Sequence, residues 1–517
     1  GAVRRRGATG TYFVATAVLD QLPQSPVGQW LAARTLAALS GDLAAFARLC
    51  AVLGRELAVA EIEWVQRRAE REGGPGSRLD TWVGLEELTL AGLLQRVADE
   101  TFVFADSLAR DGIYGSIAAR ARTTLHRYAL DFARARGDLL GVARHGAVCG
   151  AGAEAAAAYL ALGERAHSQH QHVAADQHLT RAIELAGAID DGLAGAIDDG
   201  LAGAHPVLGP ALLGRGRARY HLHRITEAVG DLQRAAELAA HREDVAGHAA
   251  ALLELATAHD WAYDFERSAA AAERAGALLS SVTDPALHAR YQVALGRTHW
   301  RREQPGAAVA TLDQAVARAR ACGETEAEIV ARLLLPLALV ITGELDRAER
   351  DFAEVIELCR TAEDWMHLAA AYANRLFLWE ARGLVEPGLA DLRASIQAAR
   401  EAGFPILEAG ASYNLAELLF WRGDDEQSLT LARRSHLLQD RFVDPPPAVA
   451  PLLLARIHAA RGEDGLAEHY LAMTEDRIGT RAATPTERIL TAAVRRSKPW
   501  SELLTAAREL PVEEALE

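Results

Sequence analysis

Small side chains recur along this chain at an almost constant interval of forty residues. Five of the six intervals are 40 residues long and one is 39. Each member of the series is followed, four and seven positions later, by further small or apolar residues, which places all three on one face of a helix. A repeat of this length predicts a solenoid of stacked helix pairs. The series is Ala228, Ser268, Ala308, Ala348, Gly388, Ser428 and Ala467.

A second series of mostly small residues stands twelve positions upstream of the first. Two small positions on either side of a turn allow antiparallel helices to pack closely. Proline occupies the upstream position at Pro336, and a proline inside a helix costs about 3 kcal/mol because it removes a hydrogen bond and clashes with the preceding turn. We therefore expect the first helix of the fifth pair to be kinked or broken near Leu335. The turns are predicted at Gly343, Gly383, Gly423 and Gly462.

Composition indicates which classes of partner and which cellular compartment to expect for the protein. The formal net charge of −15 argues against nucleic acid or an anionic membrane as the main partner. The four cysteines have neither metal-site nor disulfide spacing, which indicates reduced thiols and a cytoplasmic protein. No segment resembles a signal peptide or a membrane span, and the start at Gly1 leads us to expect a longer native protein. The cysteines are Cys50, Cys149, Cys322 and Cys359.

Catalysis is not expected of this chain. Lys498 is the only lysine, and the other 54 of the 55 basic residues are arginine. Phosphate-binding loops and protein kinases both need a lysine within a defined motif, so neither nucleotide chemistry is available here. No nucleophile elbow or zinc-protease motif is present either. We therefore predict a protein that is not an enzyme and needs no cofactor.

The region before the repeats, residues 21–130, has a different pattern and is predicted to form a small domain. Helical patterning covers Trp30–Val52, Ile62–Arg71 and a segment from Thr81 to about Leu94, with Asp80 or Thr81 as its cap. Residues 95–104 have the pattern of a short β-hairpin. Three helices followed by a hairpin describe a winged helix.

Two stretches in this region, Cys50–Leu57 and Phe102–His126, resemble the segment that follows the ATPase core in bacterial signal-transduction ATPases with numerous domains, the STAND class. The similarity is greatest to regulators in which an AAA-type ATPase precedes tetratricopeptide repeats. The resemblance implies an ATPase upstream of this chain, with residues 1–20 as a remnant of its lid, whose last helix would include Gly10–Val14. The matching positions in the second stretch are Phe102, Phe104, Leu108, Arg110, Tyr114, Leu125 and His126.

One departure from that family concerns nucleotide sensing. The family commonly has histidine where this chain has Asp106, and in related ATPases a winged-helix histidine contacts the bound nucleotide. A carboxylate would repel phosphate, which puts this contact in doubt. The alternative interpretation is that Asp106 is a capping or solvated residue.

The rest of the chain divides into a helical connector over 131–150, a repeat superhelix over 151–480 and capping helices over 481–517. We expect an all-α, tetratricopeptide-like right-handed superhelix of about eight helix pairs. Within it an octapeptide occurs twice in tandem between Gly187 and Ala202. We interpret this duplication as an insertion that lengthens a loop between repeats, because surface loops tolerate such insertions at little cost.

A histidine cluster near the first repeat pair leaves two interpretations open. Transition-metal binding is one, since two of the side chains could share a helix face. A polar turn between helices accounts for the same residues, and we predict no metal site. The cluster consists of His167, His170, His172 and His178.

The concave surface of the superhelix is the predicted binding site. In tetratricopeptide folds the first helix of each pair lines this surface, at positions eleven, eight and seven residues before the small anchor. Three of the nine tryptophans fall on it, and arginine beside tryptophan is typical of binding hot spots. Alternatively, these rings fill the core between helices. The candidate residues are Arg217, Tyr220, Trp261, Arg297, Trp300, Arg301, Leu337, Ile341, Phe377, Phe420 and Trp421.

These observations predict the sensor and interaction arm of a bacterial STAND-type regulator. Its groove would bind a partner protein, a peptide or a small inducer, and the upstream ATPase would be its partner in cis. One alternative is a freestanding tetratricopeptide scaffold or adaptor. Another is a DNA-binding regulator that uses the winged helix, which is disfavoured because the presumed reading helix carries Glu86 and Glu87 and no basic residue.

Overall fold

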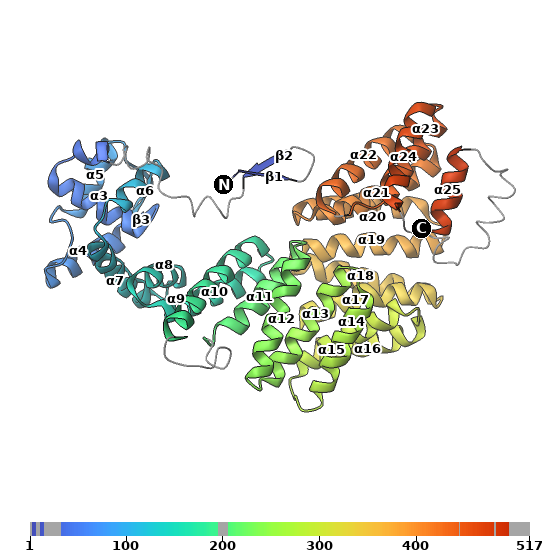
Figure 1. Cartoon of the computed structure of the whole chain (residues 1–517), viewed down its shortest axis with the longest axis horizontal. Coiled ribbons are helices and arrows are strands. Elements are labelled where there is room, and N and C mark those ends of the chain that lie inside the picture. Colours follow the sequence, from blue (N-terminus) through green and yellow to red (C-terminus); the bar gives the residue numbers. More distant parts are fainter. Residues whose placement is uncertain are drawn as a thin grey trace. The chain divides into compact units, whose positions relative to one another are not determined.

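The computed structural model describes residues 3–6, 11–14, 33–194, 205–443, 445–479 and 482–495 (Figure 1). These residues belong to two compact units, 1–242 and 243–517, which are described separately below. Helices account for most of the described chain, and from α9 onward they follow one another as a repeat array of tetratricopeptide type. The all-α fold class predicted from the forty-residue period is therefore confirmed.

Unit 1 begins with two paired strands. β1 (Val3–Arg6) and β2 (Thr11–Val14) are antiparallel, with Val3 opposite Val14. The expectation of a lid helix that includes Gly10–Val14 is therefore wrong at residues 11–14, and Gly10 lies outside the described residues. Threonine, tyrosine, phenylalanine and valine follow one another in β2, and residues of these types favour extended backbone.

A small domain follows, in which helices cover a three-stranded antiparallel sheet of order β3-β5-β4. The expected hairpin is present as β4 and β5. Strand β3 was missed, because it is a three-residue segment that pairs with β5 only through the fold, Leu57 lying opposite Phe102. The elements are α3 (Gly41–Leu53), β3 (Glu56–Ala58), α4 (Val59–Glu72), α5 (Thr81–Leu90), β4 (Leu94–Ala98), β5 (Thr101–Phe104) and α6 (Ser107–Gly115).

Two aspartates act as helix caps in this domain. The Asp80 carboxylate accepts hydrogen bonds from the backbone N–H groups of Trp82 and Val83, which starts α5. The Asp106 carboxylate accepts a hydrogen bond from the N–H of Leu108 at 2.8 Å and starts α6. The capping interpretation of Asp106 is therefore confirmed.

Helix α7 (Ala119–Arg136) runs from the expected small domain into the connector expected over 131–150, and α8 (Leu139–Cys149) lies within that connector. They bring His126 and His145 together in the interior, with their Nδ1 atoms 2.8 Å apart. The other ring nitrogen of His126 lies 2.9 Å from the Tyr114 hydroxyl of α6. Burial, with the nearby His145 and arginines, lowers the pKa of His126 to about 3. A buried polar contact thus joins the small domain to the connector.

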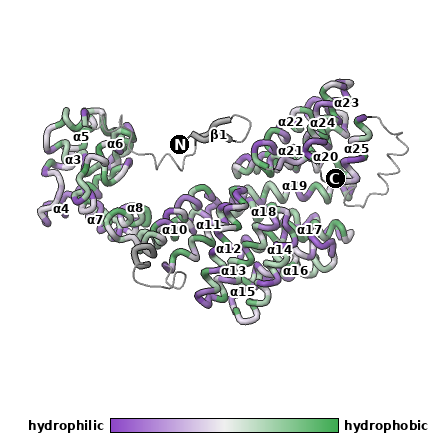
Figure 2. The backbone as a smooth tube through the Cα atoms, viewed as in Figure 1, coloured by the Kyte–Doolittle hydropathy of each residue, from purple (hydrophilic) through white to green (hydrophobic). Residues whose placement is uncertain are grey.

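Within the described residues the array contains eight helix pairs, in agreement with the prediction of about eight. Along its helices hydrophobic and hydrophilic residues alternate, as amphipathic helices require (Figure 2). Unit 1 contains α9 (Gly152–Ser168), α10 (His172–Ala194), α11 (Leu208–His221) and α12 (Ile225–His241). Unit 2 contains α13 (Val245–Trp261), α14 (Phe265–Leu279), α15 (Pro285–Arg301), α16 (Pro305–Cys322), α17 (Thr325–Ile341), α18 (Leu345–Thr361), α19 (Trp365–Ala381), α20 (Val385–Glu401), α21 (Pro405–Arg422), α22 (Asp425–Phe442), α23 (Val449–Ala460) and α24 (Asp464–Ile478).

The small-residue series forms the close contacts inside each pair. Every member of the series, and every residue four and seven positions after it, is buried. Where the member is serine, its hydroxyl donates a hydrogen bond to the backbone carbonyl twelve positions upstream: Ser268 to Ala256 at 2.8 Å and Ser428 to Ala416 at 2.7 Å. A Cβ atom added at Gly296 would lie 2.6 Å from the Leu312 side chain. The helices therefore approach too closely for larger residues.

The turns inside the pairs adopt left-handed backbone, as the four glycines indicated. Gly343, Gly383, Gly423 and Gly462 have φ between 67° and 85°. The equivalent position in the other four pairs is also left-handed but is not glycine, a conformation that costs other residues about 1 kcal/mol or more. These residues are His170, His223, Tyr263 and Glu303.

Three further expectations concern Pro336, the duplicated octapeptide and the capping region. Helix α17 runs unbroken from Thr325 to Ile341 with Pro336 buried inside it, so the expected break does not occur and a kink stays a prediction. The first copy of the octapeptide, 187–194, continues helix α10 instead of forming a loop, and the second copy lies outside the described residues. The predicted capping region contains α25 (Pro485–Arg495), and its remainder beyond 495 also lies outside them.

Candidate binding surface

The first helices of the pairs line the inner side of unit 2. Neighbouring first helices pack against one another throughout the unit, whereas contacts between successive second helices are sparse among the described residues. The side on which helices approach most closely is the concave side of a curved array. Helices α13, α15, α17, α19, α21 and α23 therefore form what we call the inner face.

The predicted surface residues in unit 2 differ widely in exposure. Leu337 is 8% exposed, and Trp300 is half-buried against the core of α15–α19. Trp421, by contrast, is 69% exposed and Phe377 is 40% exposed. Ile341 is exposed to a similar degree, 38%. Part of the predicted set therefore fills the core, and Ile341, Phe377 and Trp421, on the successive first helices α17, α19 and α21, remain open to solvent.

At the α13 end of the inner face, ion pairs hold the predicted arginines in place. Arg301 donates two hydrogen bonds to Asp260, at 3.0 and 3.1 Å, and its guanidinium lies 4.4 Å from the Phe265 ring centre. Arg297 donates to the Thr257 hydroxyl at 3.2 Å and lies 4.0 Å from Asp260. A cavity of about 550 Å³ lies beside these side chains, bordered by the turn that precedes α14.

Trp261, also predicted for the surface, contacts a distant element. Its ring centre lies 6.0 Å from that of Phe404, the residue that precedes α21. Phe404 is 6% exposed. Nothing in the repeat pattern links these two positions, because their contact depends on how far the array of unit 2 curves.

A second type of arginine clamp was missed by the sequence argument. Arg375 of α19 donates to both oxygens of Asp391 on α20, at 2.7 and 2.6 Å, and the Trp379 indole N–H donates to the same carboxylate at 2.6 Å. Arg215 and Asp231 form the same clamp in unit 1, at 2.8 and 2.7 Å. Both pairs occupy equivalent repeat positions, sixteen residues apart, so this spacing was the available signal.

The α21 end of the inner face contains two glutamates and one buried arginine. Arg456 of α23 is ion-paired with Glu417, and its guanidinium lies 5.3 Å from the Phe420 ring centre and 5.1 Å from that of Trp421. Burial, together with the neighbouring Glu417 carboxylate, raises the pKa of Glu380 to about 7. Glu380 therefore carries only part of a negative charge at neutral pH.

Unit 1 contains the remaining predicted residues. Tyr220 is 3% exposed and belongs to the core, while Arg217 is half-buried. Two of the four predicted histidines, His167 and His172, contact His221, whose ring stacks on His172 at 4.3 Å; a third, His170, contacts His172. The fourth, His178, lies apart with its ring 6.0 Å from that of Tyr159.

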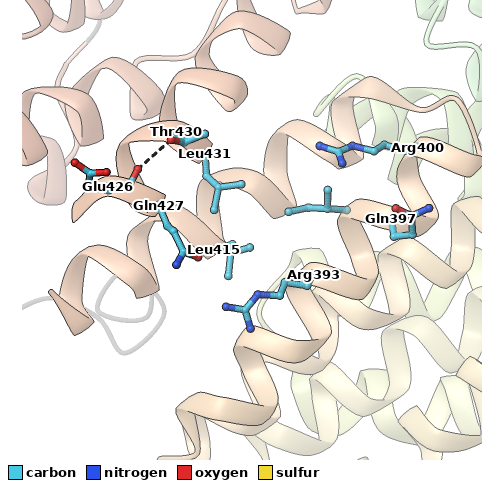
Figure 3. Close-up of a pocket in the computed structure, with 9 residues that line it drawn as sticks. Arg393, Gln397, Arg400, Leu415, Glu426, Gln427, Thr430 and Leu431 are labelled. Carbon is cyan, nitrogen blue, oxygen red and sulfur yellow. Dashed lines mark hydrogen bonds between the residues drawn. The ribbon is translucent and has the colours of Figure 1, made fainter. Parts of the chain in front are cut away.

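An outer pocket of about 530 Å³ opens between α20 and α22 (Figure 3). Arg393 lines it and has no ion-pair partner among the described residues, whereas Arg400 is ion-paired with Glu408 at 2.9 Å. Its floor includes Leu415 of α21. The lining residues are Arg393, Ile396, Gln397, Arg400, Leu415, Glu426, Gln427, Thr430 and Leu431.

Within the described part of the chain, no helix is long and apolar enough to cross a membrane.

Comparison with known proteins finds likeness in structure only. No protein-family model matches the chain, and no curated protein is similar to it in sequence. A Rap protein complexed with competence and sporulation factor is 12% identical, with a TM-score of 0.45 over 68% of this chain and 99% of that chain. A STAND protein with a tetratricopeptide repeat sensor from Pyrococcus horikoshii is 13% identical, with a TM-score of 0.45 over 94% of this chain and 65% of that chain. A tetratricopeptide repeat protein from Parabacteroides merdae is 15% identical, with a TM-score of 0.36 over 56% and 98%. Sequence identities and TM-scores this low do not indicate what this chain binds.

Proposed function

We propose that this chain is a non-catalytic interaction module whose inner face in unit 2 binds an extended segment of a partner protein or a peptide. The observation that carries the proposal is the exposure of Ile341, Phe377 and Trp421 on three successive first helices of unit 2. Large apolar side chains that gather on the concave side of a repeat array, with ion-paired arginines nearby, have the composition of a protein interface.

We further propose that the module is the sensor arm of a STAND-type regulator. The support is the resemblance of the Cys50–Leu57 and Phe102–His126 segments to that family, together with the order of a winged-helix-like domain before repeats. Partner binding would act on the upstream ATPase through the differential affinity of the partner for the resting and active forms. A freestanding adaptor is the second candidate, and the size of the endogenous polypeptide distinguishes the two.

The test is a cross-linking pull-down from source-organism lysate with a Phe377→Ser, Trp421→Ser double variant. Each captured protein is identified by mass spectrometry, purified, and titrated against the parent chain and the variant. We expect the variant to bind at least about tenfold more weakly, because exposed aromatic anchors contribute about 2 kcal/mol or more each.

The matched control is Trp365→Ser. Trp365 lies at the other end of α19 and is 43% exposed, so its removal changes exposed aromatic area without altering Ile341, Phe377 or Trp421. Equal binding by parent, double variant and control would place the partner elsewhere on the molecule.

A further inference from the structure

The cavity of about 550 Å³ in unit 2 has a buried arginine among its lining residues. It lies between the turn that precedes α14 and the C-terminal end of α15. Its volume is within the range of sites that hold small molecules in other proteins. The charges and the rings that line it indicate which class of small molecule it suits.

Arg297 is the buried arginine, with 8% of its side chain exposed. Its Nη2 atom donates a hydrogen bond to the Thr257 hydroxyl at 3.2 Å. Its Nε atom is buried as well, and it has no hydrogen-bond partner among the described residues. A buried charged donor is costly without an acceptor, so Arg297 indicates that the cavity binds an acceptor group.

The carboxylate beside Arg297 does not balance its charge. This carboxylate belongs to Asp260, and one of its oxygens lies 4.0 Å from Arg297 Nε, beyond hydrogen-bonding range. Both Asp260 oxygens already accept hydrogen bonds from Arg301, at 3.0 and 3.1 Å. Two guanidinium groups therefore share one carboxylate, which leaves an excess of one positive charge.

The other charged side chains at the cavity do not remove this excess. Glu266 has no ion-pair partner among the described residues, but it is exposed on the first turn of α14, where water screens its charge. Arg297 is shielded from water, so its charge calls for a partner in direct contact. The remaining ion pairs are Asp264 with Arg267 at 3.1 Å and Glu273 with Arg302 at 3.3 Å.

Two aromatic rings also line the cavity. Tyr263 is 78% exposed, and its ring lies edge-on to that of Phe265 with the centres 6.2 Å apart. The Arg301 guanidinium covers the Phe265 ring at 4.4 Å, whereas no cation of the described residues lies over Tyr263. The Tyr263 ring is therefore available to the apolar part of a ligand.

We propose that this cavity binds a small monocarboxylate with an aromatic or apolar body. The carboxylate accepts a hydrogen bond from Arg297 Nε and neutralises the excess positive charge, and the body packs against Tyr263. A phosphate dianion suits the cavity less well, because its second charge would be repelled by Glu266. This site is separate from the proposed peptide surface, so either can fail without the other.

The test compares three molecules of similar shape: benzoate, which is an anion, benzamide, which is neutral, and benzylamine, which is a cation. Each is titrated into the full chain at neutral pH and followed by saturation-transfer NMR, with the melting temperature as a second readout. We expect benzoate to bind at least about tenfold more tightly than benzamide, because only benzoate offers a charged acceptor to Arg297. Benzylamine should not bind, and inorganic phosphate should not displace benzoate.

Three variants of the full chain locate the binding. Arg297→Gln should weaken benzoate binding about tenfold and leave benzamide binding unchanged. Tyr263→Gly removes the ring and should weaken the binding of both ligands without lowering the melting temperature, because glycine readily adopts the φ of 58° found there. Glu266→Gln removes a repelling charge and should strengthen benzoate binding.

The matched control is His170→Gly. His170 is exposed in the equivalent turn of another pair, has a φ of 56° and does not line the cavity. This variant should bind benzoate as the parent chain does. Circular dichroism shows whether each variant is folded.

Two results would refute the inference: equal binding of benzoate and benzamide by the parent, or benzoate binding that Arg297→Gln leaves unchanged. If Arg297→Gln does not fold, Glu266→Gln decides, and unchanged or weaker benzoate binding by that variant refutes the inference. A carboxylate could also come from the end of a polypeptide, which an acetylated tripeptide ending in phenylalanine represents. Binding of that peptide without binding of benzoate would overturn the assignment to a small ligand.

Discussion

At the scale of single residues, Glu380 illustrates how position changes chemistry. A surface glutamate would be fully ionised at neutral pH, but burial and the nearby Glu417 raise the pKa of Glu380 to about 7. Because the folded state holds this proton more tightly than the unfolded state does, the stabilising contribution is present below pH 4.5 and is lost as the pH rises toward 7.

Glu380→Gln should therefore stabilise the protein at pH 8 and have little effect at pH 5. After allowance for solvent screening we expect a gain of roughly 1–2 kcal/mol in the free energy of unfolding at pH 8. Urea unfolding of parent and variant at both pH values measures it, with Glu401→Gln as control. An equal effect at both pH values would contradict the raised pKa.

At the scale of helix pairs, close approach of the backbones depends on glycine and alanine. Gly296 of α15 faces Leu312 of α16 with no room for a methyl group. Gly296→Ala should destabilise the fourth pair by about 1–3 kcal/mol, since the Leu312 side chain must move and neighbouring packing with it.

Gly306→Ala is the matched control, because Gly306 is also helical but has nothing within 4 Å of an added Cβ. There we expect a gain of roughly 0.5–1 kcal/mol from better helix propensity. Thermal unfolding followed by circular dichroism compares the two, and a stabilised Gly296→Ala protein would refute the packing argument.

The contact between His126 of α7 and His145 of α8 should make the free energy of unfolding depend on pH. Since the pKa of His126 falls to about 3 in the folded state, the unfolded state binds an additional proton between about pH 6.5 and 3. The free energy of unfolding should therefore decrease as the pH falls through this window, by up to about 1.4 kcal/mol per pH unit. His126→Gln should flatten the part of the slope between pH 7 and 5 in urea unfolding. An unchanged slope would mean that His126 titrates as an exposed histidine does.

At the scale of the whole of unit 2, the contact between Trp261 and Phe404 joins elements that are far apart in the sequence. Trp261→Ala should release the end of α13 and the start of α21 together. We expect faster hydrogen exchange in both segments, while helices α23 and α24 keep their protection. Trp421→Ala is the control, since this exposed ring supports no such contact between distant elements of the array. Faster exchange in α13 alone would show that the two segments are not coupled.

Much of the fold could be predicted, because it is encoded at short range. The small-residue series specifies which helix faces meet. Residues such as Ser268 and Gly296 are small because the paired helices approach closely there, as the series suggested. Local pattern was insufficient at β3, whose three residues become a strand only by pairing with β5. It was also insufficient at residues 11–14, which form a strand rather than the helix implied by resemblance.

The sequence alone determined the repeat period, the paired helices, the turns and the helix face that the small-residue series buries. Each of these depends on residues within one or two helices. The tertiary structure decided which inner-face side chains are free. Trp300 and Leu337 were indistinguishable from Phe377 and Trp421 by position, and only the packing of neighbouring helices separated them. In the same way the raised pKa of Glu380 comes from its burial in the fold and from Glu417 on a neighbouring first helix, which no local pattern specifies.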